Sequence, residues 1–168
     1  MSWAPEEYGE AWASIYDVAY PDLADETGPA VELLAALAGD GGRVLELGVG
    51  TGRLALPLAA RALDVTGVDA SARMLARLRD KDPGGSVAAV QADMAALDAL
   101  LPGPYDLVFV VFNTLFALPS QDAQVSCVEG AARRLRPGGR FVVDAFVPRP
   151  QTFDQDGTVN PCSVGNPE

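Results

Sequence analysis

Three glycines stand at alternate positions directly after a short apolar run, and their spacing suits a loop that holds a ligand against the backbone. The run covers 44–47 and includes Glu46, and the loop residues are Gly48, Gly50 and Gly52. An apolar segment with helical periodicity follows at once, which gives the order strand, glycine loop, helix of a nucleotide-binding βαβ unit. Glycine lets the backbone approach a ligand closely because it has no side chain.

The spacing within this loop narrows the kind of ligand. A dinucleotide fingerprint, G-x-G-x-x-G, needs a glycine at position 53, and this chain has Arg53 there. The pattern is instead E-x-G-x-G-x-G, with Glu46 two residues before the first glycine. The loop carries no P-loop lysine, so the ligand need not be a polyphosphate.

Two further acids follow later strand-like segments. Asp69 ends the run 65–68, and Asp93 follows 90–92 with Met94 directly after it. An acid at the tip of the second strand of such a unit can accept hydrogen bonds from both hydroxyls of a ribose. The alternative for both acids is structural, because carboxylates also cap helices and turns.

Four segments, in this order and at these spacings, resemble the class I S-adenosylmethionine (SAM)-dependent methyltransferases of the small-molecule type, similar to methyltransferase domain 25. They are E-L-G-V-G-T-G from Glu46, V-T-G-V-D-A-S from Val65, Q-A-D-M from Gln91 and L-R-P-G-G-R-F-V-V from Leu135. The resemblance covers 16–154 and implies SAM as the cofactor.

The resemblance implies a role in cofactor binding for each matching position. The glycine loop would lie under the methionyl part of SAM, with Glu46 ordering the loop and facing the amino end of the ligand. Asp69, followed by Ala70, would hold the ribose. Asp93 would accept from the adenine amine, and Met94 would lie on the adenine face.

Three more residues are expected near the reacting groups. Asn113 follows an apolar run at 107–112, where the resemblance places both the methionyl group and the methyl acceptor. Tyr16 and Tyr20 resemble an N-terminal element that covers SAM. Asn113 and Tyr16 are therefore the candidates for a catalytic role, and no metal site is predicted. The alternatives are a turn-forming asparagine and aromatic packing of a helix.

Alternating strand and helix signals predict an α/β fold, a three-layer αβα sandwich built on a Rossmann-like, doubly wound parallel sheet. Right-handed crossovers and the glycine loop after the first strand put that strand in the middle and predict the order 3-2-1-4-5. We expect an N-terminal helical cap at 1–40, the SAM-binding domain at 41–150 and an irregular tail at 151–168. The expected strands are 43–48, 64–69, 86–91, 105–112 and 139–147. The expected helices are 6–18, 27–38 with Thr27 as cap and Pro29 in the first turn, 51–62, 71–80 capped by Ser71, and 120–136.

The end of the chain departs from the resembled family. Full class I methyltransferases close the sheet with two further strands, and no strand pattern follows Gln155. The segment Phe141 to Val147 would then be an uncovered apolar edge, which favours association with another strand. Two alternatives follow: the chain is a truncated product or fragment, or a partner covers this edge, for which a homodimer is one prediction.

Composition limits the function further. The chain has 168 residues, a formal net charge of −11 and no histidine. The charge argues against a nucleic-acid partner, because such binding needs Lys and Arg to neutralise phosphates. The lack of histidine excludes a Ser-His-Asp hydrolase and a histidine base. No run is long enough to span a membrane and no leader is apparent, which predicts a cytoplasmic protein.

The sequence therefore predicts transfer of a methyl group from SAM to a small-molecule acceptor. A nitrogen acceptor is favoured because an amine can lose its proton to water without a histidine base. The alternatives are a truncated, catalytically weak SAM-binding or interaction module, and an NAD(P)-dependent reductase. Arg53 and the lack of a Tyr-x-x-x-Lys pair, with Lys81 the only lysine, argue against the reductase.

Overall fold

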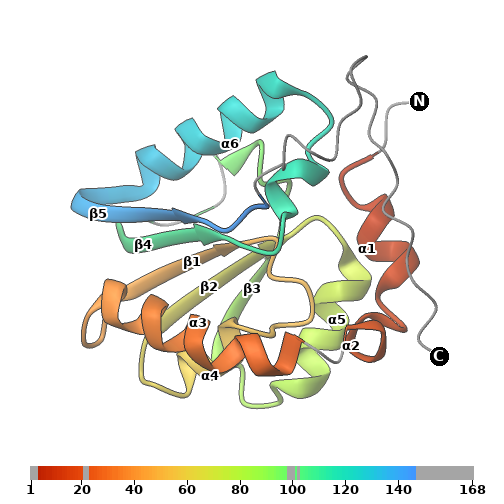
Figure 1. The fold of residues 1–168 in the computed structure, drawn as a ribbon, viewed down its shortest axis with the longest axis horizontal. Coiled ribbons are helices and arrows are strands. Elements are labelled where there is room, and N and C mark those ends of the chain that lie inside the picture. The colour runs from red at the N-terminus through yellow and green to blue at the C-terminus, as the bar shows by residue number, and fades with distance from the viewer. Residues whose placement is uncertain (1–3, 21–22, 98–100, 102, 147–168) are drawn as a thin grey trace, which may run out of the picture.

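The computed structural model describes residues 4–20, 23–97, 101 and 103–146. Five parallel strands form one sheet in the order β3-β2-β1-β4-β5, which confirms the predicted order (Figure 1). The strands are β1 (Arg43–Leu47), β2 (Asp64–Asp69), β3 (Val87–Gln91), β4 (Tyr105–Val110) and β5 (Leu135–Val143). The helices are α1 (Glu7–Trp12), α2 (Tyr16–Ala19), α3 (Leu23–Ala38), α4 (Ala55–Ala59), α5 (Ala72–Lys81), the 3-10 helix η2 (Thr114–Ala117) and α6 (Gln121–Arg134).

Side chains alternate between the two faces of the sheet, and each face has its own core. Val44 and Phe109 pack with α3, α4 and α5 on one face. Leu45 and Val108 pack with α6 on the other face. The central strands β1 and β4 are covered on both sides, which is why they read as nearly continuous apolar runs. The three-layer αβα sandwich is thus confirmed.

Several predicted element boundaries were wrong. Helix α3 begins at Leu23, so Thr27 and Pro29 lie inside it, and the acids Asp25 and Glu26 occupy its first turn. Acidic side chains there favour the helix N-terminus, which explains the earlier start. The helix predicted at 6–18 is divided into α1 and α2.

The segment after the glycine loop is also less helical than predicted. Only Ala55–Ala59 of the predicted 51–62 forms α4. Gly50 and Gly52 have φ angles of +54° and +87°. These left-handed conformations delay the start of a right-handed helix.

Strand β5 begins earlier and ends earlier than predicted. Tyr105 pairs with Leu135, but Leu107 pairs with Arg140, so the intervening residues of β5 form a bulge. Gly138, with a φ of +81°, supplies the conformation that such a bulge needs. The Pro137-Gly138-Gly139 segment, whose composition is typical of a turn, is therefore part of this strand.

Helices α1 and α2 cover the carboxyl ends of β1 and β2 through polar contacts. Glu10 Oε1 accepts hydrogen bonds from Ser71 Oγ at 2.8 Å and from the Arg73 N–H at 3.1 Å. Asp17 accepts from Thr51 Oγ1 at 2.6 Å and pairs with Lys81 Nζ at 2.7 Å. These contacts fix α1 and α2, which we call the cap helices, beside the glycine loop.

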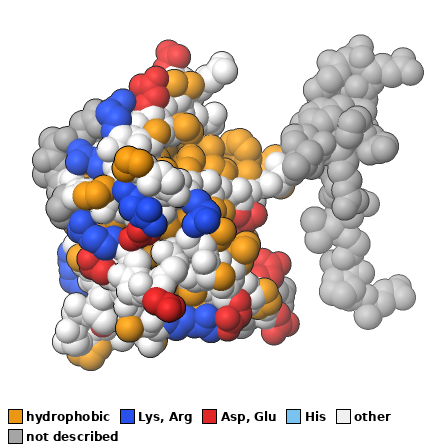
Figure 2. All heavy atoms as spheres, turned by 90° about the vertical axis from the view of Figure 1, so that its left-hand side faces the viewer, with side chains coloured by type: hydrophobic (Ala, Val, Ile, Leu, Met, Phe, Trp, Pro, Cys, Tyr) orange, Lys and Arg blue, Asp and Glu red, His pale blue; other side chains and the backbone are white. Residues whose placement is uncertain are grey.

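The opposite, amino edge of the sheet carries interspersed basic and acidic side chains (Figure 2). Arg43 pairs there with Asp64, and Arg136 pairs with Asp106. No helix in the described part of the chain is both long and apolar enough to cross a membrane.

Two predictions concern the end of the chain. Strand β5 lies at one edge of the sheet and pairs with β4 among the described residues, and a homodimer through this edge stays a prediction. The predicted tail at 151–168 lies outside the described residues.

The close packing of α1 on α5 predicts a cost for a side chain at Gly9. A Cβ there would lie 2.4 Å from Ser71 Cβ. Gly9→Ala should lower the free energy of unfolding by about 1–3 kcal/mol, as overpacking does. Urea unfolding measures this. Gly84→Ala is the control, because a Cβ at Gly84 meets nothing within 4 Å. Equal stability of the two variants would contradict the packing described.

Candidate functional site

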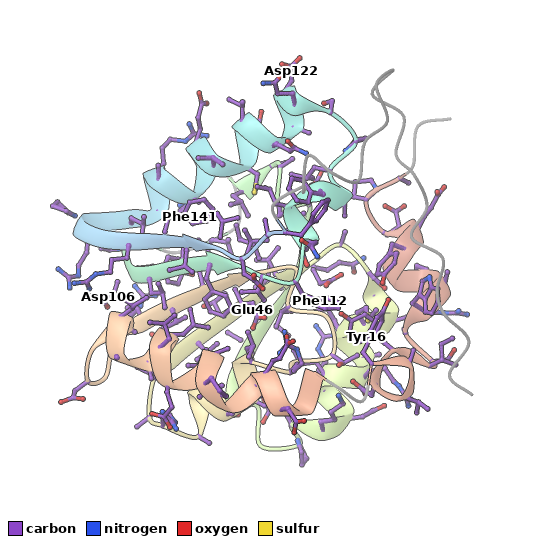
Figure 3. All side chains as sticks on the ribbon, viewed as in Figure 1. Tyr16, Glu46, Asp106, Phe112, Asp122 and Phe141 are labelled. Atoms are coloured by element: carbon purple, nitrogen blue, oxygen red, sulfur yellow. The ribbon has the colours of Figure 1, made fainter. Side chains whose placement is uncertain are left out.

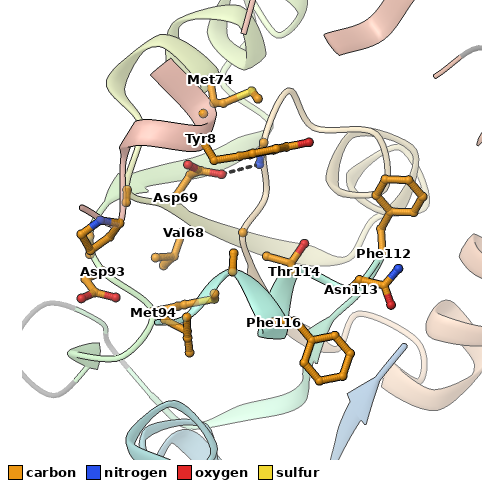
Figure 4. A pocket seen from close by; sticks show the side chains of 18 of the residues that line it. Tyr8, Val68, Asp69, Met74, Asp93, Met94, Phe112, Asn113, Thr114 and Phe116 are labelled. Atoms are coloured by element: carbon orange, nitrogen blue, oxygen red, sulfur yellow. Dashed lines mark hydrogen bonds between the residues drawn. The ribbon is translucent and has the colours of Figure 1, made fainter. Parts of the chain in front are cut away.

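A cavity of about 540 Å³ lies at the carboxyl ends of β1, β2 and β4, beneath the cap helices (Figure 4). This volume is within the range of small-molecule sites, about 300–1,000 Å³. The predicted site residues that line it are Gly48, Gly50, Asp69, Ala70, Asp93, Met94, Asn113, Tyr16 and Tyr20. The sheet edge thus brings together residues that are far apart in the sequence.

The three loop glycines serve different purposes. A Cβ on Gly50 would meet nothing within 4 Å, because it would point into the open cavity. A Cβ on Gly48 would lie 2.3 Å from Thr114 Cγ2, and one on Gly52 would lie 3.1 Å from Leu56 and Leu78. Gly48 and Gly52 therefore allow close packing, whereas Gly50 is the position at which a ligand can approach the backbone.

Asp69 joins the ends of two strands. Its Oδ2 accepts from the Gly50 N–H at 2.8 Å, and its Oδ1 accepts from the Ser71 N–H at 2.9 Å. Burial raises the pKa of Asp69, and the two N–H donors oppose that rise. Ser71, rather than Asp69, caps α5, since Ser71 Oγ accepts from the Met74 N–H at 3.2 Å. The predicted cap at Ser71 is confirmed.

Asp93 and Met94 lie at the end of the cavity away from Phe112 and Asn113 (Figure 4). Asp93 Oδ1 accepts from the Ala95 N–H at 2.8 Å. This contact is the turn cap that the sequence left as an alternative, and it occupies one carboxylate oxygen. Met94 lines the cavity while packing against the α6-side core.

The chain leaves β4 through a left-handed turn at the other end of the cavity. Phe112 and Asn113 have φ angles of +56° and +61°, and the Thr114 N–H donates to the Val111 carbonyl at 3.2 Å. These features define a type I′ turn. A left-handed conformation at a residue as bulky as Phe112 costs about 1–3 kcal/mol.

Aromatic side chains surround this turn. The Phe112 ring meets Tyr20 edge-on at a centroid distance of 5.3 Å, and Tyr20 packs against Tyr16 at 5.1 Å. The Tyr8 and Tyr20 hydroxyls lie 3.4 Å apart. Phe116 lines the same end of the cavity. Burial raises the pKa of Tyr16, so its phenol stays protonated at neutral pH.

Glu46 lies behind the cavity wall rather than in it. Its side chain is buried, and its Oε2 has no hydrogen-bond partner in the described part of the chain. Burial raises the pKa of Glu46 to about 8, although Arg53 acts in the opposite direction. Figure 3 shows Glu46 toward the carboxyl end of β1. Neither Glu46 nor Gly52 lines the cavity.

Arg53, which directly follows the glycine loop, packs against the turn at the end of β4. It is half-buried, its guanidinium carbon lies 6.0 Å from the Phe112 ring centroid, and it donates to Thr27 Oγ1 at 3.2 Å. It therefore supports the wall of the cavity from behind.

Sequence reasoning missed several lining residues, namely Tyr8, Phe112, Thr114 and Phe116. Three of these belong to the F-N-T-L-F segment that contains Asn113, so their proximity to the cavity could have been inferred from that position. Tyr8 needed the packing of α1 on α5, which no local pattern indicates.

The comparisons with known proteins identify the family. Residues 44–139 match the methyltransferase domain family. The cypemycin N-terminal methyltransferase of a Streptomyces species is 32% identical over 86% of this chain and 58% of its own length. Among solved structures, the CcbJ methyltransferase of Streptomyces caelestis is 42% identical with a TM-score of 0.77, covering 84% of this chain and 58% of that one.

A second solved structure is SAM-bound CalS10, an amino pentose methyltransferase of Micromonospora echinaspora. It is 27% identical with a TM-score of 0.69, covering 83% of this chain and 59% of that one. Relatives named as O- and C-methyltransferases also match, so the family leaves the acceptor atom open. This chain covers less than two thirds of the length of the cypemycin methyltransferase, of CcbJ and of CalS10.

The chain belongs to the methyltransferase domain family, within the class I SAM-dependent methyltransferases, and its cofactor is SAM. The cavity fits this cofactor chemically. The Asp69 carboxylate can accept from hydroxyl groups, and the space that a Cβ on Gly50 would occupy is free for a ligand. The NAD(P)-dependent reductase considered from the sequence is not supported.

The buried carboxyl of Glu46 predicts a pH dependence of stability. The unfolded chain ionises Glu46 near pH 4.5 and the folded chain near pH 8. Between these values the folded state holds the extra proton, so this carboxyl lowers the free energy of unfolding by about 1.4 kcal/mol per pH unit as pH rises. The free energy of unfolding of Glu46→Gln, measured with urea, should therefore rise relative to that of the parent as the pH increases from 5 to 8. A difference that is constant across this range would contradict the burial described.

Proposed function

We propose that this chain methylates a small-molecule amine with SAM as the methyl donor. One observation carries the proposal: a single cavity has two distinct ends. One end is formed by the Gly50 backbone and the Asp69 carboxylate, and the other by Phe112, Phe116 and Asn113. The first end has the chemistry of a nucleoside site, and the second is aromatic with a neutral polar group. Such an arrangement can hold a donor and an acceptor side by side.

Each predicted residue has a place in this proposal. Asp93 and Met94 would contact the adenine, and Asp69 beside Ala70 would accept from the ribose hydroxyls. Each Asp69 oxygen already accepts one N–H bond, and a carboxylate oxygen has a second lone pair for a ligand. The glycine loop would lie along the methionyl part, with Glu46 supporting it from behind.

The residues at the Phe112 end of the cavity would orient the methyl acceptor and shield it from water, and none of them would act as a charged group. Bound SAM would supply a methyl group on a cationic sulfur, and that sulfur would leave as a neutral thioether, which is a good leaving group. Catalysis then needs mainly alignment and exclusion of water, which the Phe112, Tyr16 and Tyr20 rings can provide. Tyr16 remains protonated because its pKa is raised, so it can donate a hydrogen bond but is a poor base at neutral pH.

Two observations support nitrogen as the acceptor atom. The chain has no histidine, so an acceptor that loses its proton to water is the easiest to methylate. One relative is named for N-terminal methylation and one solved neighbour for an amino pentose.

The proposal is tested in two steps. Isothermal titration with SAM and its product S-adenosylhomocysteine (SAH) measures binding. A screen with radiolabelled SAM against simple amines, amino sugars and peptide N-termini then measures transfer. Binding without transfer to any class would favour the non-catalytic SAM-binding module instead. Absence of binding would overturn the proposal.

The open space at Gly50 predicts that a side chain there blocks the ligand. Gly50→Val should abolish SAH binding while the protein stays folded. The control is Gly85→Val, because Gly85 also has a positive φ of +65° and open space around its Cβ. Both variants should lose a similar stability, about 1–2 kcal/mol, but only Gly50→Val should lose the ligand in titration. Normal SAH binding by Gly50→Val would contradict the assignment.

Asp69 is predicted to contribute directly to affinity. Asp69→Ala should weaken SAH binding at least about tenfold, since hydrogen bonds to a charged group are worth roughly 1.5–3 kcal/mol. Asp82→Ala is the matched control, because Asp82 accepts from the Val87 N–H at 2.9 Å and from Ser86 Oγ at 2.8 Å. Asp82 does not line the cavity. If both variants bind SAH equally well, Asp69 has only a structural role.

A further inference from the structure

We infer that Asp144 is a positioning residue, which holds the turn at Phe112 and Asn113 in the shape that forms the cavity wall. Asp144 directly follows β5 and is exposed. The inference rests on the proposed function, because it assigns this turn to the end of the cavity that binds the amino-acid part of the cofactor and the acceptor.

The turn needs support from outside itself. Type I′ turns place both central residues at positive φ and favour Asn, Asp or Gly there. Asn113 suits the second central position, but Phe112 at +56° is a bulky residue in the first. A backbone held in such a conformation persists only when the surroundings fix it, and such sites cluster where a protein binds or reacts.

Asp144 supplies that support through three hydrogen bonds. Its N–H donates to the Val110 carbonyl at 2.9 Å, which continues the pairing of β5 with β4. Its carbonyl accepts from the Asn113 N–H at 3.2 Å. Its Oδ2 accepts from the Phe112 N–H at 3.1 Å. Both central N–H groups of the turn thus donate to this one residue.

The same turn sets what the wall presents to a ligand. Asn113 Oδ1 accepts from the Phe146 N–H at 2.7 Å. Because a backbone N–H can only donate, this contact fixes which end of the amide is oxygen. The amide nitrogen of Asn113, which has no partner among the described residues, is left to donate to a ligand. If Phe112 relaxed to negative φ, its ring and the Asn113 amide would both leave their positions.

Two ligands of different length separate positioning from general damage. SAH carries an amino-acid part, whereas 5′-methylthioadenosine ends in a methylthio group at that place and should not reach the turn. Asp144→Ala should weaken SAH binding about tenfold, as the loss of a charged hydrogen-bond acceptor does. It should leave methylthioadenosine binding unchanged. Asp122→Ala, which removes an exposed acid from the first turn of α6, should change neither.

Two further variants test the cause. Asp144→Asn keeps an oxygen that can accept the Phe112 N–H, so it should recover most of the SAH affinity. Phe112→Gly removes the strain, because glycine adopts positive φ freely. Adding Asp144→Ala to Phe112→Gly should therefore change SAH affinity less than it does in the parent. Equal weakening of both ligands by Asp144→Ala, no weakening of SAH, or no recovery with Asn would overturn the inference.

Amide hydrogen exchange tests the inference without any ligand. Asp144→Ala should speed exchange of the Phe112 amide about tenfold, because the N–H loses its acceptor, and leave Val108 in the centre of β4 unchanged. Unchanged exchange at Phe112 would overturn the inference, whether or not the parent binds a ligand. If the parent binds neither SAH nor methylthioadenosine, that result overturns the proposed function and leaves the exchange test valid. If Asp144→Ala does not fold, the double variant with Phe112→Gly is used, and it should match Phe112→Gly in methylthioadenosine affinity.

Discussion

The 2.8 Å hydrogen bond from the Gly50 N–H to Asp69 Oδ2 links the ends of β1 and β2 at the point where the cavity begins. The Val68 carbonyl also accepts from the Gly48 and Val49 N–H groups at 2.8 and 2.9 Å. The glycine loop is therefore folded back across the end of β2. It can lie so close because a Cβ on Gly67 would be 2.6 Å from Val49 Cγ2, so only glycine leaves room there. The floor of the cavity depends on this crossing.

The residues around the cavity have features that are rare in the two apolar cores, namely carboxyl groups away from solvent and a strained backbone. Glu46 places a carboxyl in a core position of β1, the half-buried Asp69 has a raised pKa, and Phe112 adopts a left-handed conformation. Each of these features costs stability. The apolar layers on both faces of the sheet offset the cost, because β1 and β4 bury almost every side chain. Such violations are expected where a protein binds a ligand.

The sequence predicted those features that a local pattern encodes. The sheet order followed from alternating strand and helix signals, right-handed crossovers and the glycine loop after the first strand. Asp69 and Asn113 followed from the rule that ligands bind at the carboxyl ends of parallel strands, and Asp93 followed from the resemblance to the methyltransferases. The predicted boundaries of helices and strands were wrong where contacts with other elements override the local sequence signal. The bulge in β5 arises from pairing with β4, which the Pro-Gly-Gly signal could not distinguish from a turn. The role of Asp144 was equally invisible, because it depends on contacts between residues more than thirty positions apart.

The cap helices contact the same residues that shape the cavity floor. Asp17 binds Thr51 between two loop glycines, and Glu10 binds Ser71, whose N–H also donates to Asp69. These contacts are polar and partly exposed, so each contributes little on its own. Tyr8 and Tyr16 line the cavity, where the Tyr16 ring packs against Tyr20 and the Tyr8 hydroxyl lies 3.4 Å from the Tyr20 hydroxyl. A ligand that fills the cavity therefore adds contacts for the cap helices, so ligand binding and docking of these helices must favour each other.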